Sequence, residues 1–123
     1  MAKATISVLF LILFFISVGI SALVNGEENY WCVAKPSSEE ILLKNNVDYA
    51  CTQPNVNCDP VLGMGGPCFY PNTAINHASV AMNLYYQAYK FLGPSACDFG
   101  QSGLLSIKDP SYHDCVYALV PGR

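Results

Sequence analysis

The clearest pattern in the chain lies between residues 72 and 92, where apolar and polar side chains alternate at the spacing of a helix. Asn72 is a favourable N-terminal cap, and the pair Gly93-Pro94 is a strong stop signal. One stripe is apolar or aromatic and predicts the buried face: Ala74, Ala78, Ala81, Met82, Tyr85, Tyr89 and Leu92. The opposite stripe, which is polar apart from one large ring, predicts a solvent-facing side: Asn76, Ser79, Asn83, Tyr86, Gln87 and Lys90.

A second helix is predicted from Ser37 to about Gln53, where Pro54 ends it. Ser37 and Glu40 have the spacing of a capping box, in which both side chains bond free backbone N–H groups of the first turn. The pattern predicts that a set of mainly apolar residues shares the buried side of this helix: Ile41, Leu42, Val47, Ala50 and Cys51.

The remaining segments read as loops and short strands. Residues 55–71 are rich in Gly, Pro and Asn and predict an irregular loop. The short apolar runs 104–107 and 115–117, each preceded by a turn sequence, predict short antiparallel strands. The expected fold class is therefore α+β, a small domain with two main helices packed with a small antiparallel sheet.

The N-terminal 26 residues have the layout of a secretory signal peptide. Lys3 precedes an apolar run from Val8 to Ile16, and small residues follow at Ala22 and Gly26. We expect cleavage after Gly26, which leaves residues 27–123 as a secreted, extracellular and monomeric domain without a membrane segment. The alternative is an uncleaved membrane anchor, because the run is nearly long enough to span a bilayer.

All six cysteines lie after the leader: Cys32, Cys51, Cys58, Cys68, Cys97 and Cys115. An even number in a small exported chain predicts three disulfide bonds, and six cysteines allow fifteen pairings. A metal site is not expected, because the chain has no Cys-x-x-Cys pair and its two histidines, His77 and His113, lie in unrelated segments.

Charge and motifs exclude several classes of function. Residues 27–123 carry 5 Lys and Arg against 9 Asp and Glu, a formal charge of 5 − 9 = −4, which argues against a nucleic-acid partner. The acids lie at a helix start or in turns, where they are commonly structural. No nucleophile motif accompanies either histidine. We therefore expect a protein that is not an enzyme and needs no cofactor.

Aromatic content points to carbohydrate. Twelve Tyr, Phe and Trp side chains follow the leader, more than so small a core can bury. Tyr86 with Asn83 and Gln87 combines a ring with two amides on adjacent turns, a group suited to a sugar's C–H face and hydroxyls. We predict a ligand site there, with Phe99 or Tyr112 as a second platform, although Tyr86 could also half-pack against a loop. If that face proves buried, the next candidate is the loop bearing Phe69 and Tyr70.

Seven short motifs occur in order around the six cysteines and resemble the plant X8 domain, also classed as carbohydrate-binding module family 43. They are Trp31–Lys35, Asp48–Cys51, Gly66–Thr73, His77–Ser79, Asn83–Gln87, Cys97–Gly100 and Asp109–Tyr112. The resemblance covers nearly all of residues 30–117, the core of the domain expected over 27–123.

The resemblance implies a function and a disulfide pairing. Members of the family bind β-1,3-glucans such as callose and laminarin, and this chain is similar to the free-standing secreted type known from certain pollen allergens of the plant cell wall. The family order pairs the first cysteine with the fifth, the second with the third and the fourth with the sixth. Here that implies three bonds: Cys32–Cys97, Cys51–Cys58 and Cys68–Cys115. Asn57 and Gln101 depart from the family pattern.

Two other hypotheses belong to different classes. The chain could be a small secreted defence protein, such as a lipid-transfer protein or a protease inhibitor, although it lacks the adjacent cysteine pairs of lipid-transfer proteins. It could also be a structural wall protein that does not bind glucan. A laminarin pull-down with a cellulose control separates these from glucan binding.

Overall fold

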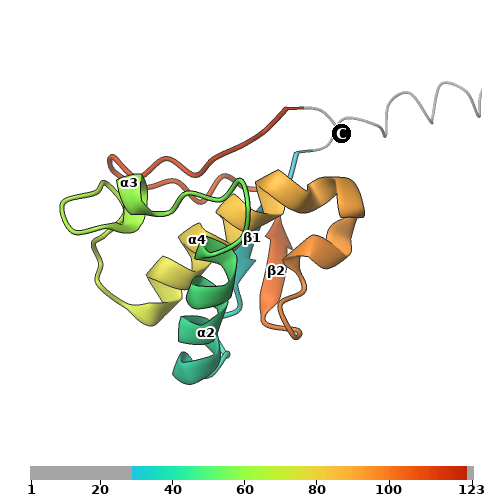
Figure 1. Ribbon diagram of the computed structural model, residues 1–123, viewed down its shortest axis with the longest axis horizontal. Coiled ribbons are helices and arrows are strands. Elements are labelled where there is room, and N and C mark those ends of the chain that lie inside the picture. Colours follow the sequence, from blue (N-terminus) through green and yellow to red (C-terminus); the bar gives the residue numbers. More distant parts are fainter. Residues whose placement is uncertain (1–28, 122–123) are drawn as a thin grey trace, which may run out of the picture.

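The computed structural model of this chain describes residues 29–121 (Figure 1). The elements follow in the order β1 (Trp31–Ala34), α2 (Glu40–Cys51), α3 (Asp59–Leu62), α4 (Ala74–Tyr89), the 3-10 turns η2 (Lys90–Leu92) and η3 (Pro94–Cys97), and β2 (Gly103–Ser106). Helix α4 lies at the centre and contacts both α2 and β1. The fold is α+β as predicted, with the short α3 as an addition, and the predicted leader lies outside the described residues.

Helix α4 confirms the strongest sequence pattern, with one change at its start. Its cap is Thr73 rather than Asn72, because the Thr73 hydroxyl accepts a hydrogen bond from the Asn76 N–H at 3.2 Å. After Tyr89 the chain tightens into η2 and reaches Gly93, whose φ of 102° favours glycine. Gly93-Pro94 therefore ends this helical segment, as the sequence indicates.

Helix α2 begins later and is turned differently from the prediction. Because it starts at Glu40, Ser37 lies outside the first turn, and the predicted capping box does not form. The buried side consists of Leu43, Asn46 and Ala50, whereas Ile41 is 64% exposed, so the prediction for Ile41 is wrong. The sequence pattern did not predict this buried face, because one of its three residues, Asn46, is polar.

Asn46 is buried because its amide has partners inside the protein. Its Nδ2 donates to the Ser102 Oγ at 2.8 Å and lies 3.6 Å from the Met82 sulfur. The Ser102 hydroxyl in turn lies close to the Phe99 carbonyl. A buried amide with a bonded partner costs far less than an unpaired one. This link orients α2 against α4 and the turn before β2.

The sheet has two antiparallel strands, β1 and β2, with Trp31 opposite Ser106 and Ala34 opposite Gly103. The predicted strand at 104–107 is confirmed with a shift of one residue. The predicted strand at 115–117 is wrong, because residue 115 forms only an isolated bridge with Tyr112, and the chain beyond it finds partners on α4.

Three disulfide bonds connect the six cysteines in the pairing that the family resemblance implies: Cys32–Cys97, Cys51–Cys58 and Cys68–Cys115. Cys32–Cys97 joins β1 to the end of η3 and lies in the main core around Met82. Cross-links between segments far apart in sequence stabilise a small domain mainly by restricting its unfolded chain. Cys32–Cys97 and Cys68–Cys115 are of this kind, with separations of 65 and 47 residues, whereas Cys51–Cys58 closes a short loop after α2.

Candidate functional site

The residues predicted to bind a ligand, Asn83, Gln87 and Tyr86, are buried. Their side chains are 1%, 5% and 6% exposed. Ser79, one turn before Asn83, is also buried. We call Ser79, Asn83 and Gln87 the polar ladder, since they stand four residues apart along one face of α4. The prediction that this face meets solvent is wrong, and its partners explain why.

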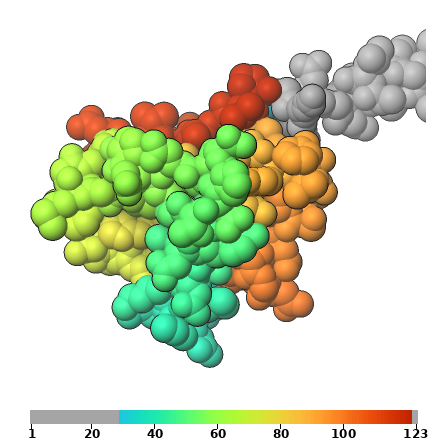
Figure 2. Space-filling model, viewed as in Figure 1, coloured from blue at the N-terminus to red at the C-terminus, as the bar shows by residue number. Residues whose placement is uncertain are grey.

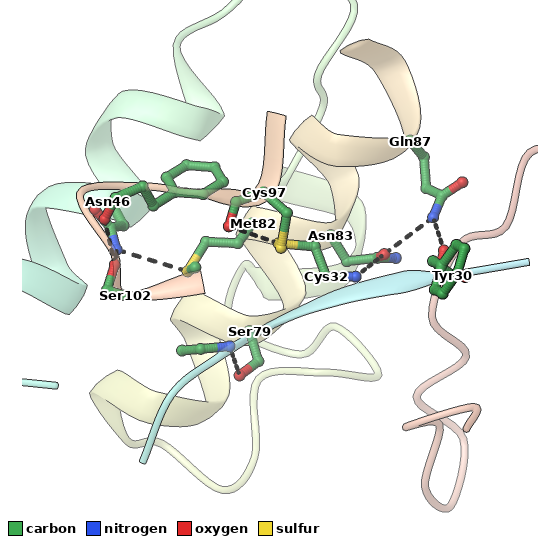
Figure 3. The surroundings of a disulfide bond; sticks show 11 residues. Tyr30, Cys32, Asn46, Ser79, Met82, Asn83, Gln87, Cys97 and Ser102 are labelled. Atoms are coloured by element: carbon green, nitrogen blue, oxygen red, sulfur yellow. Dashed lines mark hydrogen bonds between the residues drawn. A yellow bond between two sulfur atoms is a disulfide. The ribbon is translucent and has the colours of Figure 1, made fainter. Parts of the chain in front are cut away.

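The polar ladder binds the free edge of β1 (Figure 3). The Ala34 N–H donates to the Ser79 hydroxyl at 3.0 Å, and the Cys32 N–H donates to the Asn83 carbonyl oxygen at 3.0 Å. The Gln87 amide donates to the Tyr30 carbonyl at 3.0 Å. Four helical residues rise about 6 Å and two strand residues about 6.6 Å, so the two spacings match. The helix thus takes the place of a third strand.

The same side chains also hold the C-terminal segment, which runs beside them in an extended form. The Asn83 amide donates to the Ala118 carbonyl at 2.8 Å, and the Val120 N–H donates to the Gln87 carbonyl oxygen at 3.0 Å. Lys90 adds bonds from its ammonium to Gln87 and to the Val120 carbonyl. Asn83 and Gln87 therefore join two backbone segments, and they leave no room for a sugar between them.

Phe99, the first of the two alternative second platforms, belongs to a group of five rings. Its centroid lies 5.4 Å from that of Tyr85 and 6.4 Å from that of Tyr49. Tyr85 stacks on Tyr89 at 4.5 Å, and Tyr89 lies 6.1 Å from Phe91. We call these five residues the aromatic strip. They come from α2, α4, η2 and the turn before β2.

The aromatic strip is open to solvent at both ends and half-buried in the middle. Tyr49 is 51% exposed and Phe91 is 68% exposed, whereas Tyr85, Tyr89 and Phe99 are half-buried. The prediction of Tyr85 as a core residue is therefore only partly right, since it packs on the main core from outside. Exposed rings in a continuous row suit an apolar or carbohydrate ligand.

Hydrogen bonds between the strip and its surroundings fix the ring positions. A side-chain hydrogen bond with Tyr49 raises the pKa of Tyr85 to about 12, and burial acts in the same direction. The Tyr89 hydroxyl donates to the Pro54 carbonyl at 2.7 Å. Rings that are already positioned lose little conformational entropy when a ligand binds.

Tyr112, the second alternative platform, lies in a different cluster from Phe99. It packs against the group around Trp31, and its hydroxyl lies 2.7 Å from the Tyr70 carbonyl and 2.9 Å from the Asn76 Oδ1. Tyr112 therefore secures the loop bearing Phe69 and Tyr70 to α4. Phe99 and Tyr112, the two alternatives for a second ligand platform, therefore lie in different parts of the molecule.

A groove of about 580 Å³ lies between the first turns of α2 and the start of α4, and we call it the polar groove. It is lined by Glu40, Lys44, Val47, Asp48, Asn72, Thr73, Ala74 and His77. In Figure 2, α2 lies between the yellow start of α4 on one side and the orange segment after α4 on the other. At about 100° per residue, Tyr49 points about 140° away from Lys44 around α2. The groove and the strip thus use opposite sides of α2.

Sequence reasoning missed Tyr49, Tyr89 and Phe91 as members of one surface. The signal available was the spacing of Tyr85 and Tyr89, which stand four residues apart on one helix face. Tyr49 and Phe99 could not be added, because only the packing of α2 and of the turn before β2 brings them there. Because Tyr85 and Tyr89 are both predicted to be core residues, the sequence does not indicate that their rings form part of a surface.

Two further features bear on the kind of function. Within residues 29–121, no group of three or more His, Cys, Asp or Glu side chains could hold a metal ion. In the same part of the chain, every helix is too short or too polar to cross a membrane.

Comparison with known proteins identifies one family. The model described as "X8 domain" matches residues 30–104. The major pollen allergen Ole e 10 of Olea europaea is 40% identical over 87 residues, which cover 71% of this chain and 69% of the allergen. A glucan endo-1,3-beta-glucosidase of Triticum aestivum is 46% identical over 87 residues, covering 71% of this chain and 18% of the wheat protein.

A third relative is the glucan endo-1,3-beta-glucosidase 13 of Arabidopsis thaliana, 39% identical over 99 residues. The match covers 80% of this chain and 19% of that protein. The chain thus spans about a fifth of the length of the glucosidases it matches. The matched range of the family model includes α2, α4, β1 and every ring of the aromatic strip.

Proposed function

The chain belongs to the X8 domain family, and on this premise we propose that it is a non-catalytic module that binds β-1,3-glucan through its aromatic strip. Family membership supports a role as a carbohydrate-binding module. Hydrolysis is not carried over from the glucosidases, because this chain corresponds to less than a fifth of their length. The aromatic strip is the observation that carries the proposal.

The aromatic strip provides the two kinds of group that bind a sugar chain, namely apolar ring faces and hydroxyl groups. The C–H groups of a pyranose face are apolar, so they release water when they pack on an aromatic ring. Exposed rings at Tyr49 and Phe91, with half-buried rings between them, provide several such contacts in a row. The hydroxyls of Tyr49 and Tyr85 supply polar groups at the same surface for sugar hydroxyls.

The orientation of the rings favours a curved chain over a flat one. Tyr85 and Tyr89 are inclined by 22°, Tyr49 and Tyr85 by 55°, and Tyr85 and Phe99 by 74°. A β-1,4 linkage joins opposite positions of each sugar ring and gives a straight, flat chain, whereas a β-1,3 linkage bends the chain at every unit. The planes of neighbouring rings differ, so the strip does not form one flat platform for a straight chain. This geometry supports β-1,3-glucan rather than cellulose.

We also propose the place where the protein acts. Residues 1–26 have the layout of a signal peptide, and three disulfide bonds suit the oxidising space outside the cell. We therefore assign residues 27–123 to a monomeric binding domain of the plant cell wall. Labelling of thiols in the secreted protein without reductant tests this, because a fully oxidised domain takes up no label.

Affinity electrophoresis with laminarin, and with a soluble β-1,4-glucan as control, tests the proposed ligand. We expect retardation by laminarin only. Tyr49→Ala should weaken binding about tenfold, because it removes an exposed ring at one end of the strip. Tyr49→Phe keeps the ring and should retain most of the affinity. Equal binding by wild type and Tyr49→Ala would contradict the strip as the site.

A further inference from the structure

We propose that the polar groove is a second, independent site for β-1,3-glucan, so that one module can bridge two glucan chains. The inference rests on the proposed function of the aromatic strip and adds a site that the strip does not use. Its volume of about 580 Å³ is within the range of about 300–1,000 Å³ that small-ligand sites occupy.

The charge of the groove selects a neutral ligand. Glu40 and Asp48 provide two carboxylates against the single ammonium of Lys44. Lys44 is already paired with Glu40 at 3.0 Å, which leaves the carboxylate of Asp48 unbalanced. An acidic polysaccharide or a phosphate would meet this charge unfavourably. A neutral chain rich in hydroxyl groups meets no such repulsion and finds strong acceptors.

Several polar groups in the groove are available to hydroxyls. Within residues 29–121, the side chains of Asp48 and Asn72 form no hydrogen bond to protein. His77 Nε2 lies 2.7 Å from the Phe69 carbonyl oxygen, which can only accept, so Nε2 carries the proton. In the neutral ring Nδ1 is then an acceptor. Together these groups can bond both as donors and as acceptors.

Apolar surface lies beside these polar groups, as a sugar site requires. Val47 and Ala74 line the groove and are half-buried. A row of rings continues outward from His77, since Phe69 lies 5.5 Å from it and Tyr70 lies 4.9 Å from Phe69. The Tyr70 ring is exposed. A glucan unit in the groove can therefore place its C–H groups on apolar atoms and its next units towards Tyr70.

The position of the groove keeps its ligand separate from that of the strip. The groove is lined by the side of α2 that carries Glu40, Lys44 and Asp48, whereas the Tyr49 side chain lies on the other side of the helix, against Tyr85. A sugar unit bound in the groove therefore leaves the rings of the strip free for another unit. Two chains bound to opposite sides of one helix are joined by the module, and on an extended network the two contacts act together.

Titration calorimetry with a β-1,3-linked hexaose, together with light scattering of long laminarin, tests the inference. Wild type should bind two hexaose molecules and increase the scattering of laminarin. The double variant Asp48→Ala/Asn72→Ala should bind one molecule and fail to increase scattering. The strip variant Tyr49→Ala should bind one molecule as tightly as wild type and the second about tenfold more weakly, and it should increase scattering less. Asn45→Ala, an exposed α2 substitution outside the groove and the strip, should behave as wild type.

The outcomes separate this inference from the proposed function. If wild type binds one hexaose and Tyr49→Ala weakens the binding of that one molecule, the groove is not a glucan site and the strip remains one. If wild type binds no hexaose, the proposed function fails as well. If NMR signals of Lys44 and His77 respond to a lysine-rich peptide and not to the hexaose, the groove binds protein and the inference is wrong.

Discussion

The polar ladder and the aromatic strip lie on the same helix, and their exposures are the reverse of what their side chains suggest. The ladder consists of a serine and two amides, side chains normally found at the surface, and all three are buried. The strip takes Tyr85 and Tyr89 from the same helix, on the stripe predicted to be core, and both are only half-buried. Composition therefore does not decide which stripe meets solvent.

The difference follows from the backbone around each stripe. The ladder faces two segments with unpaired backbone groups, the free edge of β1 and the C-terminal segment, and its amides bond both. A buried backbone group without a partner is costly, so a polar stripe is the stable choice there. The strip faces only the end of α2 and the turn before β2, which cover the rings incompletely.

The largest expected effect comes from Tyr86, the ring between the two stripes. Tyr86→Ala should lower the free energy of unfolding by about 3–5 kcal/mol, because a buried ring is replaced by a cavity. Tyr85→Ala should lower it by about 1–2 kcal/mol, since its ring is only half-buried. Urea unfolding of both variants measures this. A greater loss for Tyr85 would reverse the assignment of the two stripes.

A smaller loss is expected when the ladder loses its central amide. Asn83→Ala leaves the buried Cys32 N–H without its bond, at about 1–3 kcal/mol, whereas the Ala118 carbonyl is only half-buried and adds less because water can replace its bond. Melting curves should show this loss, whereas laminarin affinity below the melting temperature should be unchanged. Asn45→Ala, at an exposed position on α2, provides the control. If Asn83→Ala loses laminarin binding but no stability, this prediction is wrong and Asn83 contacts the ligand.

Alkaline pH should distinguish a ring beside the ladder from a ring of the strip. Burial is the largest cause that raises the pKa of Tyr117 to about 12. The charge of Tyr112 also raises this pKa, whereas a hydrogen bond with Ser79 lowers it. Because the folded pKa lies above the ordinary value of 10, the stabilisation is complete below pH 10 and is lost as pH rises through 12.

A rise of the Tyr117 pKa from 10 to about 12 corresponds to about 3 kcal/mol of stability. Melting temperatures between pH 9 and pH 12 should therefore fall steeply for wild type and less steeply for Tyr117→Phe. Tyr85 has the same direction of shift, but water screens its ring, so Tyr85→Phe should change the slope less. Equal slopes in wild type and Tyr117→Phe would contradict this role for Tyr117.

The smallest effect concerns the far end of the strip. Phe91 and Leu92 are neighbouring residues, both more than half exposed, but only Phe91 contacts another ring of the strip. Phe91→Ala should weaken laminarin binding about fivefold, or about 1 kcal/mol, because one ring contact is lost. Leu92→Ala should bind as wild type, and neither change should alter stability appreciably. If the two variants have equal effects on binding, Phe91 does not contact the ligand and the binding surface consists of the other four rings.

The disulfide pairing and the disposition of side chains differ in how far sequence could predict them. The order of motifs around the cysteines implied one pairing out of fifteen, and the structure contains it. Of the residues predicted to contact glucan, Asn83, Gln87 and Tyr86 are buried, whereas Phe99 lies in the aromatic strip and its role in binding stays a prediction. A motif records which residues are kept together and not whether they face a ligand or another part of the chain.

Local sequence determined the features that depend on neighbours in the chain. The position of α4 and the stop at Gly93-Pro94 follow from spacing, capping and backbone preferences over a few residues. The irregular loop predicted over 55–71 is only partly right, because the short helix α3 (Asp59–Leu62) forms within it. Only the tertiary structure decided which stripe of α4 is buried. That choice depends on whether β1 and the segment at Ala118–Val120 bring unpaired backbone groups to the helix, and these segments lie 33 to 57 residues from their ladder partners.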